Sequence, residues 1–171
     1  HKLHCLGAPA VATDGGVVAA CQDQVIALSP EGNLRWQVAT QGELSAAPAI
    51  GPDGTVYFGD DSRRLSALDG QGVARFSFIS GAPIRGGVAV RADGVVIFGA
   101  LDGVIYAVRP DGSLLWSYQT GDAIVAAPTP PPRTNEPAVA PVATKPKPTT
   151  APVAAPATET VASAETKTKF P

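Results

Sequence analysis

The chain has 171 residues, with 13 Lys and Arg against 15 Asp and Glu, so that its formal net charge is −2. It has neither the strong basic stripe that nucleic-acid binding needs nor a run of about 18 apolar residues that could span a membrane. The length suits one ordinary domain, and two cysteines are too few for a disulfide-based scaffold.

Residues 1–8, HKLHCLGA, precede the first predicted strand and are expected to be a connector or a frayed end. His1, His4 and Cys5 are an incomplete ligand set for zinc, so no metal site is predicted there. Two interpretations of the cysteines stay open. Cys21 fits a small, buried apolar residue at a strand end, whereas a Cys5–Cys21 disulfide would suit an exported protein.

From residue 9 to residue 128 the chain repeats a unit of about 40 residues. Trp36, Phe76 and Trp116 recur at one constant interval, which is the length of the unit. Three other classes of position keep the same step: Gly32, Gly72 and Gly112; Leu28, Leu68 and Val108; and, with the first interval shorter by one, Pro9, Pro48, Val88 and Pro128. We therefore divide this part of the chain into units at 9–47, 48–87 and 88–128.

Each unit is predicted to form four short strands joined by turns. The first strands read PAVA, PAIG and VAVR, the second VVAA, VYFG and VIFG, the third VIAL, LSAL and IYAV, and the fourth LRWQV, ARFSF and LLWSY. These segments are rich in β-branched and aromatic residues, and the turns between them are rich in Asp-Gly. Four antiparallel strands in each repeat of this length are typical of a β-propeller blade. The prediction is an all-β fold, a partial β-propeller of about three four-stranded antiparallel blades.

A blade carries apolar side chains on both faces and is stable only when neighbouring blades cover them. The aromatic residues of the fourth strands, Trp36, Phe76 and Trp116, are accordingly predicted to be large buried fillers between blades. On that interpretation, replacing Trp116 by Ala would cost about 3–5 kcal/mol.

Two segments resemble the PQQ-like, or quinoprotein-type, β-propeller repeat: DGTVYFG…LSALDGQG (53–72) and DGVIYAVRPDGSLLW (102–116). The resemblance covers residues 8–128. It departs in the first unit, where VVAACQDQVIAL lacks the aromatic residue and the glycine turn, and at Phe76, where Trp is usual.

Quinoprotein dehydrogenases, as the resemblance implies, hold pyrroloquinoline quinone with calcium and an Asp base, and many have a disulfide between adjacent cysteines. No cysteines are adjacent here, and the Asp residues that precede Gly fit turn chemistry. Such residues include Asp14, Asp53, Asp93, Asp102 and Asp111. No catalytic residue, metal or cofactor is predicted, and the chain is not expected to be an enzyme. A fragment of a PQQ-dependent dehydrogenase stays open as an alternative.

Three blades cannot close a ring, because propellers have about 4–8 blades. Each open face would expose on the order of 350 Å² of mostly apolar surface. We expect the chain to be a fragment of a longer propeller, since HKLHCLGA falls where the connector from a preceding blade would lie. Completion of the ring by further copies of the chain, or capping by its own ends, are the alternatives.

The last segment, 129–171, is mostly Ala, Pro, Thr, Val and Lys, and is predicted to be a disordered linker. The resemblance implies a non-catalytic scaffold that binds another protein, in the manner of outer-membrane assembly lipoproteins with this repeat. The expected location is the periplasm or cell envelope. A polysaccharide- or cell-wall-binding module is a further alternative. The partner surface is expected on the second unit, where arginines gather: Arg63, Arg64, Arg75 and Arg85.

Overall fold

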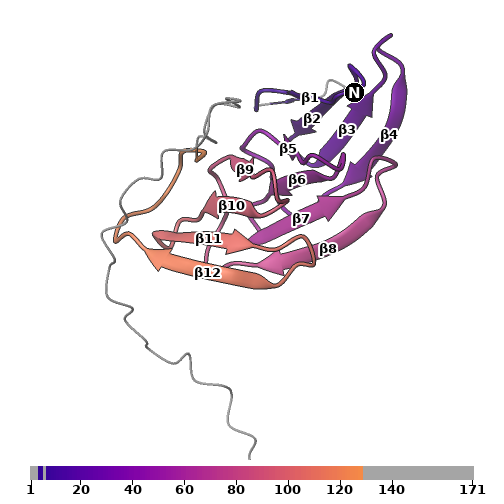
Figure 1. Ribbon diagram of the computed structural model, residues 1–171. Helices are drawn as coiled ribbons and strands as arrows, with labels where there is room; N and C mark the ends of the chain where they lie inside the picture. The colour runs from indigo at the N-terminus through magenta and orange to yellow at the C-terminus, as the bar shows by residue number, and fades with distance from the viewer. Residues whose placement is uncertain (1–3, 6, 129–171) are drawn as a thin grey trace, which may run out of the picture. The chain divides into compact units, whose positions relative to one another are not determined.

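The computed structural model describes residues 4, 5 and 7–128 (Figure 1). The predicted disordered linker, 129–171, lies outside the described residues. The described part contains twelve β-strands, and it has no helix long and apolar enough to cross a membrane.

The strands form three antiparallel sheets of four, each made from consecutive segments. The first sheet, blade 1, contains β1 (Ala10–Val11), β2 (Val17–Cys21), β3 (Gln24–Leu28) and β4 (Leu34–Ala39). Blade 2 contains β5 (Ala49–Ile50), β6 (Val56–Gly59), β7 (Arg64–Leu68) and β8 (Ala74–Ile79). Blade 3 contains β9 (Val88–Val90), β10 (Val96–Gly99), β11 (Val104–Val108) and β12 (Leu114–Gln119). The prediction of an all-β fold with three four-stranded antiparallel blades is confirmed.

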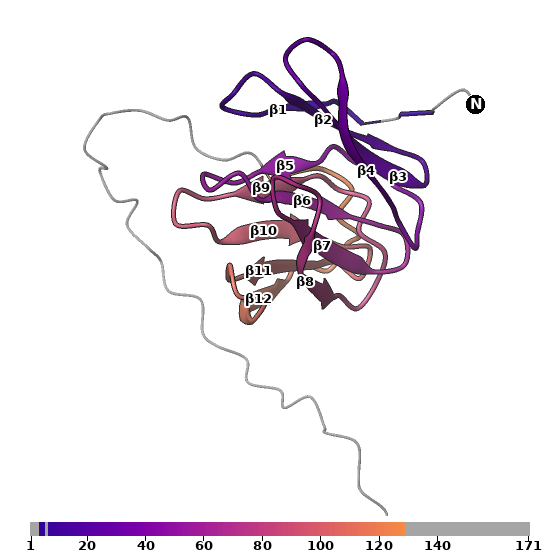
Figure 2. The same ribbon diagram turned by 90° about the vertical axis from the view of Figure 1, so that its right-hand side faces the viewer.

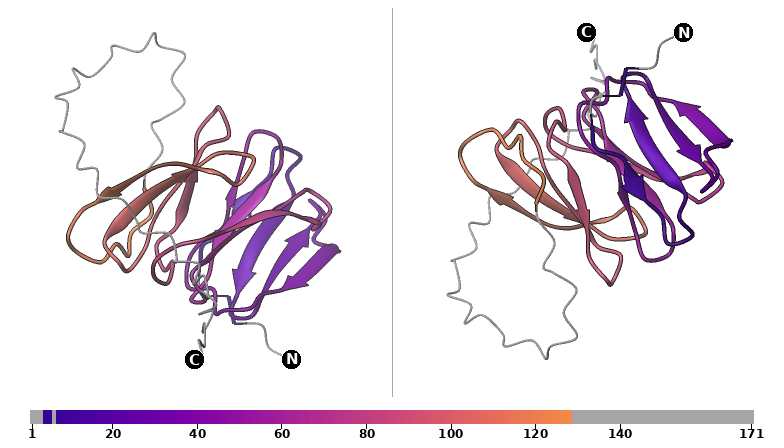
Figure 3. Two further views of the ribbon diagram at one scale, coloured as in Figure 1. Left: turned by 90° about the horizontal axis from the view of Figure 1, so that it is seen from below. Right: turned by 90° about the horizontal axis from the view of Figure 1, so that it is seen from above.

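The blades lie as successive layers from the first to the third (Figures 2 and 3). The first strands of the blades, β1, β5 and β9, contact one another in series, and the fourth strands β4, β8 and β12 form the opposite edge (Figure 1). Each third strand shifts register against its fourth strand at one repeated place, Ala27/Leu28, Ala67/Leu68 and Ala107/Val108. The repeat in sequence is therefore a repeat in backbone geometry.

The predicted turn chemistry recurs in all three blades. Asp carboxylates accept hydrogen bonds from backbone N–H groups two residues later, as Asp14 does from Gly16 at 2.9 Å. The same bond links Asp53 to Thr55, Asp93 to Val95, and Asp111 to Ser113. These carboxylates hold turns together, as the turn interpretation of the Asp-Gly pairs requires.

Apolar side chains on both faces of blade 2 are covered by its neighbours. Val56, Phe58 and Leu68 pack with blade 1 in one hydrophobic cluster. Tyr57, Leu65 and Ala67 pack with blade 3 in a second cluster. Because the two faces alternate along the strands, one sheet contributes to two cores, and the stability of each blade depends on the next.

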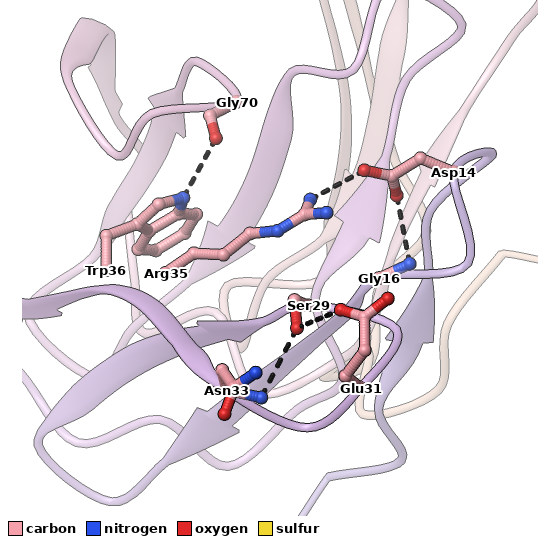
Figure 4. A network of polar contacts seen from close by, with 8 residues as sticks. All are labelled: Asp14, Gly16, Ser29, Glu31, Asn33, Arg35, Trp36 and Gly70. Carbon is pink, nitrogen blue, oxygen red and sulfur yellow. Dashed lines mark hydrogen bonds and ion pairs between the residues drawn. The ribbon is translucent and has the colours of Figure 1, made fainter.

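The fourth-strand aromatic residues differ in their surroundings. Trp36 is half-buried, and its indole N–H donates to the carbonyl of Gly70 in blade 2 at 2.9 Å (Figure 4). Phe76 is also half-buried and lies against Gly112 of blade 3. Trp116, predicted to be buried, is instead 42% exposed. The physical reason is that no blade follows blade 3 within the described residues, so nothing there covers its outer face.

Segments between blades bind the turn that follows the second strand of the next blade. The carbonyl of Glu43 accepts from the N–H of Asp61, and that of Pro83 accepts from the N–H of Leu101, both at 3.0 Å. The carbonyl of His4 accepts from the N–H of Gln22 at 2.8 Å. Since His4, Glu43 and Pro83 recur at the spacing of the repeat, the segment around His4 makes the hydrogen bond of an inter-blade connector.

Cys5 and Cys21 form a disulfide. Cys21 is also fully buried at the end of β2, so the buried-residue interpretation and the disulfide interpretation describe the same side chain. The disulfide ties the segment beside His4 to blade 1.

Candidate binding groove

A groove of about 340 Å³ lies between blade 1 and blade 2. One wall is the end of β4 and the residues after it, 38–41, and the other wall is formed by β7 and β8. The two walls belong to successive blades, blade 1 and blade 2 (Figure 2). The apolar side chains of Val38, Phe58 and Leu68 line the groove together with polar side chains from β7 and β8.

Asp60, in the turn between β6 and β7, is 1% exposed and lines the groove. Its Oδ1 accepts a hydrogen bond from the Ser62 hydroxyl at 2.6 Å and from the Arg64 backbone N–H at 3.0 Å. Both bonds use Oδ1, which leaves Oδ2 able to accept from a bound donor. The turn includes Arg63 at φ 68°, a left-handed conformation that is unusual for a residue other than Gly.

Arg64, at the start of β7, lines the groove. Its Nη1 donates to the Ser77 hydroxyl of β8 at 2.8 Å. Its Nε is buried and has no hydrogen-bond partner among the described residues. A buried donor of this kind is costly to leave unpaired, and an acceptor that reached Nε would remove that cost.

Arg75 also lines the groove and forms an ion pair with Asp53 at 2.5 Å. Blade 1 has the same pair, Arg35 with Asp14, at 2.6 Å (Figure 4). The hydrogen bond from Arg35 is the main cause that lowers the pKa of Asp14. Burial raises the pKa of Asp53, but hydrogen bonds from Thr55 and Arg75 outweigh it, and the net pKa is lowered. Arg75 is therefore part of an ion pair that links the first turn of its blade to the fourth strand.

Arg85 lies outside the groove, on the connector after blade 2. Its Nε and Nη2 donate to the two carboxylate oxygens of Asp61 at 3.0 and 2.8 Å. The hydrogen bonds that Arg85 donates to Asp61 are the main cause that raises the pKa of Arg85. Of the four predicted site residues, the structure places Arg64 and Arg75 in the groove and leaves Arg63 and Arg85 exposed beside the turn at Asp60.

The sequence analysis missed the groove and its other polar residues, among them Asp60, Ser66 and Ser77. The signal was present in the repeat. Ser66 lies one repeat before Tyr106, so the two residues occupy equivalent positions in their blades. Val38 is equivalent to Phe78 in the same way. The first interface therefore has two smaller side chains than the second.

A buried carboxylate, a guanidinium with an unpaired N–H and two serine hydroxyls line the groove together with apolar side chains, a mixture that is also found in ligand pockets. Within residues 4, 5 and 7–128 no group of three or more His, Cys, Asp or Glu side chains is placed to hold a metal ion.

Solved structures share this fold. BamB from Moraxella catarrhalis matches with a TM-score of 0.59 and 24% identity over 67% of this chain and 37% of that chain. The WD40 repeats of RRP9 match with a TM-score of 0.66 and 18% identity over 74% of this chain and 42% of that one. The computationally designed protein Ika8 matches with a TM-score of 0.64 and 20% identity, over 74% and 40%.

The chain thus spans less than half the length of these solved proteins. No family model matches the chain, and no curated protein matches it. WD40 repeats build β-propellers, and the three four-stranded sheets described above are blades of that fold. The similarity establishes the β-propeller fold of this chain.

Proposed function

We propose that the chain is a non-catalytic β-propeller scaffold of the PQQ-like type, which binds a protein partner at the corner formed by the groove and the turn at Asp60. The observation that carries the proposal is that Asp60, which lines the groove, belongs to the same turn as exposed Arg63 and as Asp61, which binds the exposed Arg85 side chain. Arg is favoured in protein interfaces because its planar group makes several directed hydrogen bonds. A rigid sheet scaffold holds such loop residues in place without a catalytic group.

The proposed location is the periplasm or cell envelope. The Cys5–Cys21 disulfide supports it, because disulfides persist in oxidising compartments and are rare in the cytosol. The resemblance of the repeat to that of outer-membrane assembly lipoproteins points the same way. The similarity to BamB, at 24% identity, concerns the fold alone.

The proposal is tested by charge reversal at the exposed corner. The chain, linked to a resin through its C-terminal end, is used to capture proteins from an envelope extract, and the captured proteins are compared by mass spectrometry. Arg63→Glu with Arg85→Glu is expected to abolish capture of the specific partner. Arg109→Glu is the matched control, because Arg109 is an exposed arginine in a turn of blade 3. Its capture should equal that of the unchanged chain.

Two results would contradict the proposal. One is a partner that is retained equally by all variants, which would place the binding surface elsewhere. The other is quinone absorbance with calcium-dependent dye reduction after addition of pyrroloquinoline quinone, which would make the chain part of a quinoprotein enzyme. Circular dichroism of each variant shows that the fold is kept.

A further inference from the structure

The interface between blades 2 and 3 shows how the equivalent of the groove is filled. Tyr106 of β11 stacks on Phe98 at a centroid distance of 5.2 Å and an interplanar angle of 15°. Phe78 of β8 packs against Tyr106 from blade 2, at a centroid distance of 5.8 Å and an angle of 60°. Three aromatic rings therefore close this position.

At the interface between blades 1 and 2, smaller side chains stand in place of two of these three rings. Phe58 occupies the position of Phe98, but Ser66 replaces Tyr106 and Val38 replaces Phe78. The strand pairing is unchanged, since Phe58 pairs with Ser66 as Phe98 pairs with Tyr106. The groove is thus the space that a tyrosine and a phenylalanine occupy in the next interface, with one aromatic wall retained.

The hydroxyl of Tyr106 shows what polar groups this position offers to a phenol. It donates to Oδ2 of Asp102 at 2.6 Å and accepts from the backbone N–H of Gly81 at 3.1 Å. Gln41 occupies the position of Gly81 one repeat earlier, and it lines the groove. Ser62 occupies the position of Asp102, and its hydroxyl donates to the buried carboxylate of Asp60, which remains the acceptor on this side; the unpaired Nε of Arg64 supplies a further donor.

We propose that the groove between blades 1 and 2 receives the side chain of a tyrosine from the partner protein. The ring lies against Phe58, the hydroxyl donates to Asp60, and it accepts from Arg64 Nε or the Gln41 amide. The inference rests on the proposed function, because it takes a protein as the source of the phenol. A carboxylate is a poorer fit than a phenol, since Asp60 would repel it and could not accept a hydrogen bond from it.

The first test uses p-cresol, the side-chain analogue of tyrosine, with toluene as the ligand that lacks only the hydroxyl. In ¹⁵N-labelled protein, p-cresol is expected to shift the Gln41 amide and the Arg64 Nε–H resonances saturably. Toluene should bind at least roughly tenfold more weakly, because the buried polar groups are then left without a partner. Arg64→Ala should weaken p-cresol binding by roughly tenfold.

A variant that rebuilds the filled interface gives the sharpest control. Val38→Phe with Ser66→Tyr places in the groove the residues found in the next interface, and it should raise the melting temperature and abolish p-cresol binding. Val73→Tyr adds a tyrosine at a position that is 61% exposed and should leave p-cresol binding unchanged. Persistence of p-cresol binding in the filled variant, or absence of saturable shifts in the unchanged protein, would overturn the inference.

The second test separates this inference from the proposed function. The capped peptide Gly-Gly-Tyr-Gly-Gly should compete with p-cresol, whereas its Phe counterpart should not. Binding of p-cresol without competition by the tyrosine peptide overturns the inference in favour of a site for free phenols. Loss of partner capture in the Arg63 and Arg85 variant, with capture retained in the filled variant, also overturns it while leaving the proposed function standing.

Discussion

The indole of Trp36 lies directly on the backbone of Gly72 in the next blade. A Cβ atom at Gly72 would be 2.8 Å from the indole Cδ2, a distance that real Cβ atoms do not tolerate. Phe76 lies in the same way on Gly112, where the distance to its Cδ2 would be 2.9 Å. The aromatic residue of one blade and the turn glycine of the next therefore form one repeated contact, and both residues recur at the same spacing because they recur as a pair.

Gly32 offers a test of this contact, because it is the same turn position without an aromatic neighbour. Gly32 and Gly72 have φ values of 84° and 82°, and nothing among the described residues lies within 4 Å of a Cβ at Gly32. Gly32→Ala should cost only the left-handed strain, about 1–2 kcal/mol. Gly72→Ala should cost about 1–3 kcal/mol more, because the indole must move.

The measurement is the free energy of unfolding from urea titration of both variants. Gly112→Ala provides the replicate, since its neighbour is Phe76 and its φ is 86°. Equal losses for Gly32→Ala and Gly72→Ala would mean that the ring moves away at no cost, and that the stacking contributes nothing to the fit between blades.

Replacing Trp36 by Ala should lower the free energy of unfolding more than replacing Trp116 by Ala, although the two residues are equivalent in the repeat. Trp36→Ala removes a half-buried ring and its hydrogen bond to Gly70, and it should lower the free energy of unfolding by about 3 kcal/mol. Trp116 is 42% exposed, so Trp116→Ala should cost about 1 kcal/mol.

Fluorescence of the two single-tryptophan variants checks the same difference without unfolding the protein. Replacing Trp36 by Phe leaves Trp116 as the only emitter, and its emission should be red-shifted and readily quenched by iodide. The variant that keeps only Trp36 should emit at shorter wavelength and resist quenching. Equal quenching in the two variants would contradict the exposed position of Trp116.

The periodicity of the sequence was sufficient to predict the blades. Turn residues such as Gly32, strand residues and aromatic residues recur together, and only a stacked repeat makes all of them recur at one spacing. The exposure of Trp116 could not be read in the same way. Its sequence context is that of Trp36, and its burial depends on whether a further blade covers it, which is a property of the assembly and not of the strand.

The groove could not be predicted from any single segment, because its two walls come from different blades. Ser66 and Val38 are ordinary strand residues when each is considered alone. That Ser66 and Val38 leave space between two blades becomes evident only on comparison with Tyr106 and Phe78, and only once these two rings are known to pack against each other. The arginines attracted attention by their charge, yet Arg75 is bound to Asp53 in a pair that blade 1 also has.

The disulfide should stabilise the first blade. Cys5 and Cys21 are separated by 16 residues, and closing a loop of that size in the unfolded chain corresponds to about 3 kcal/mol. Cys5→Ser with Cys21→Ser should lower the free energy of unfolding by about that amount and make it insensitive to reductant. The unchanged chain should lose the same stability when reduced. Intact mass after alkylation without reductant checks the bond itself, since two modified cysteines would contradict it.

The ion pairs of the first two blades predict a loss of stability in acid. Hydrogen bonds from Arg35 lower the pKa of Asp14, and those from Thr55 and Arg75 lower that of Asp53, from a usual value of 3.8. A carboxyl group whose pKa is lower in the folded state stabilises the fold fully above its unfolded pKa. That contribution is lost as the pH falls through the lower, folded value. The free energy of unfolding should therefore decrease from about pH 5 downward.

Asp14→Asn with Asp53→Asn should lower stability at neutral pH and flatten this dependence, so that the two curves converge at the acid end. Because all four side chains are partly exposed, the difference should shrink in about 1 M salt, where charges are screened within a few ångströms. The check is a series of urea titrations between about pH 2 and pH 7 at low and high salt. Parallel curves for the two proteins would show that these carboxylates have the same pKa folded and unfolded, and would leave the Arg–Asp pairs without a role in acid stability.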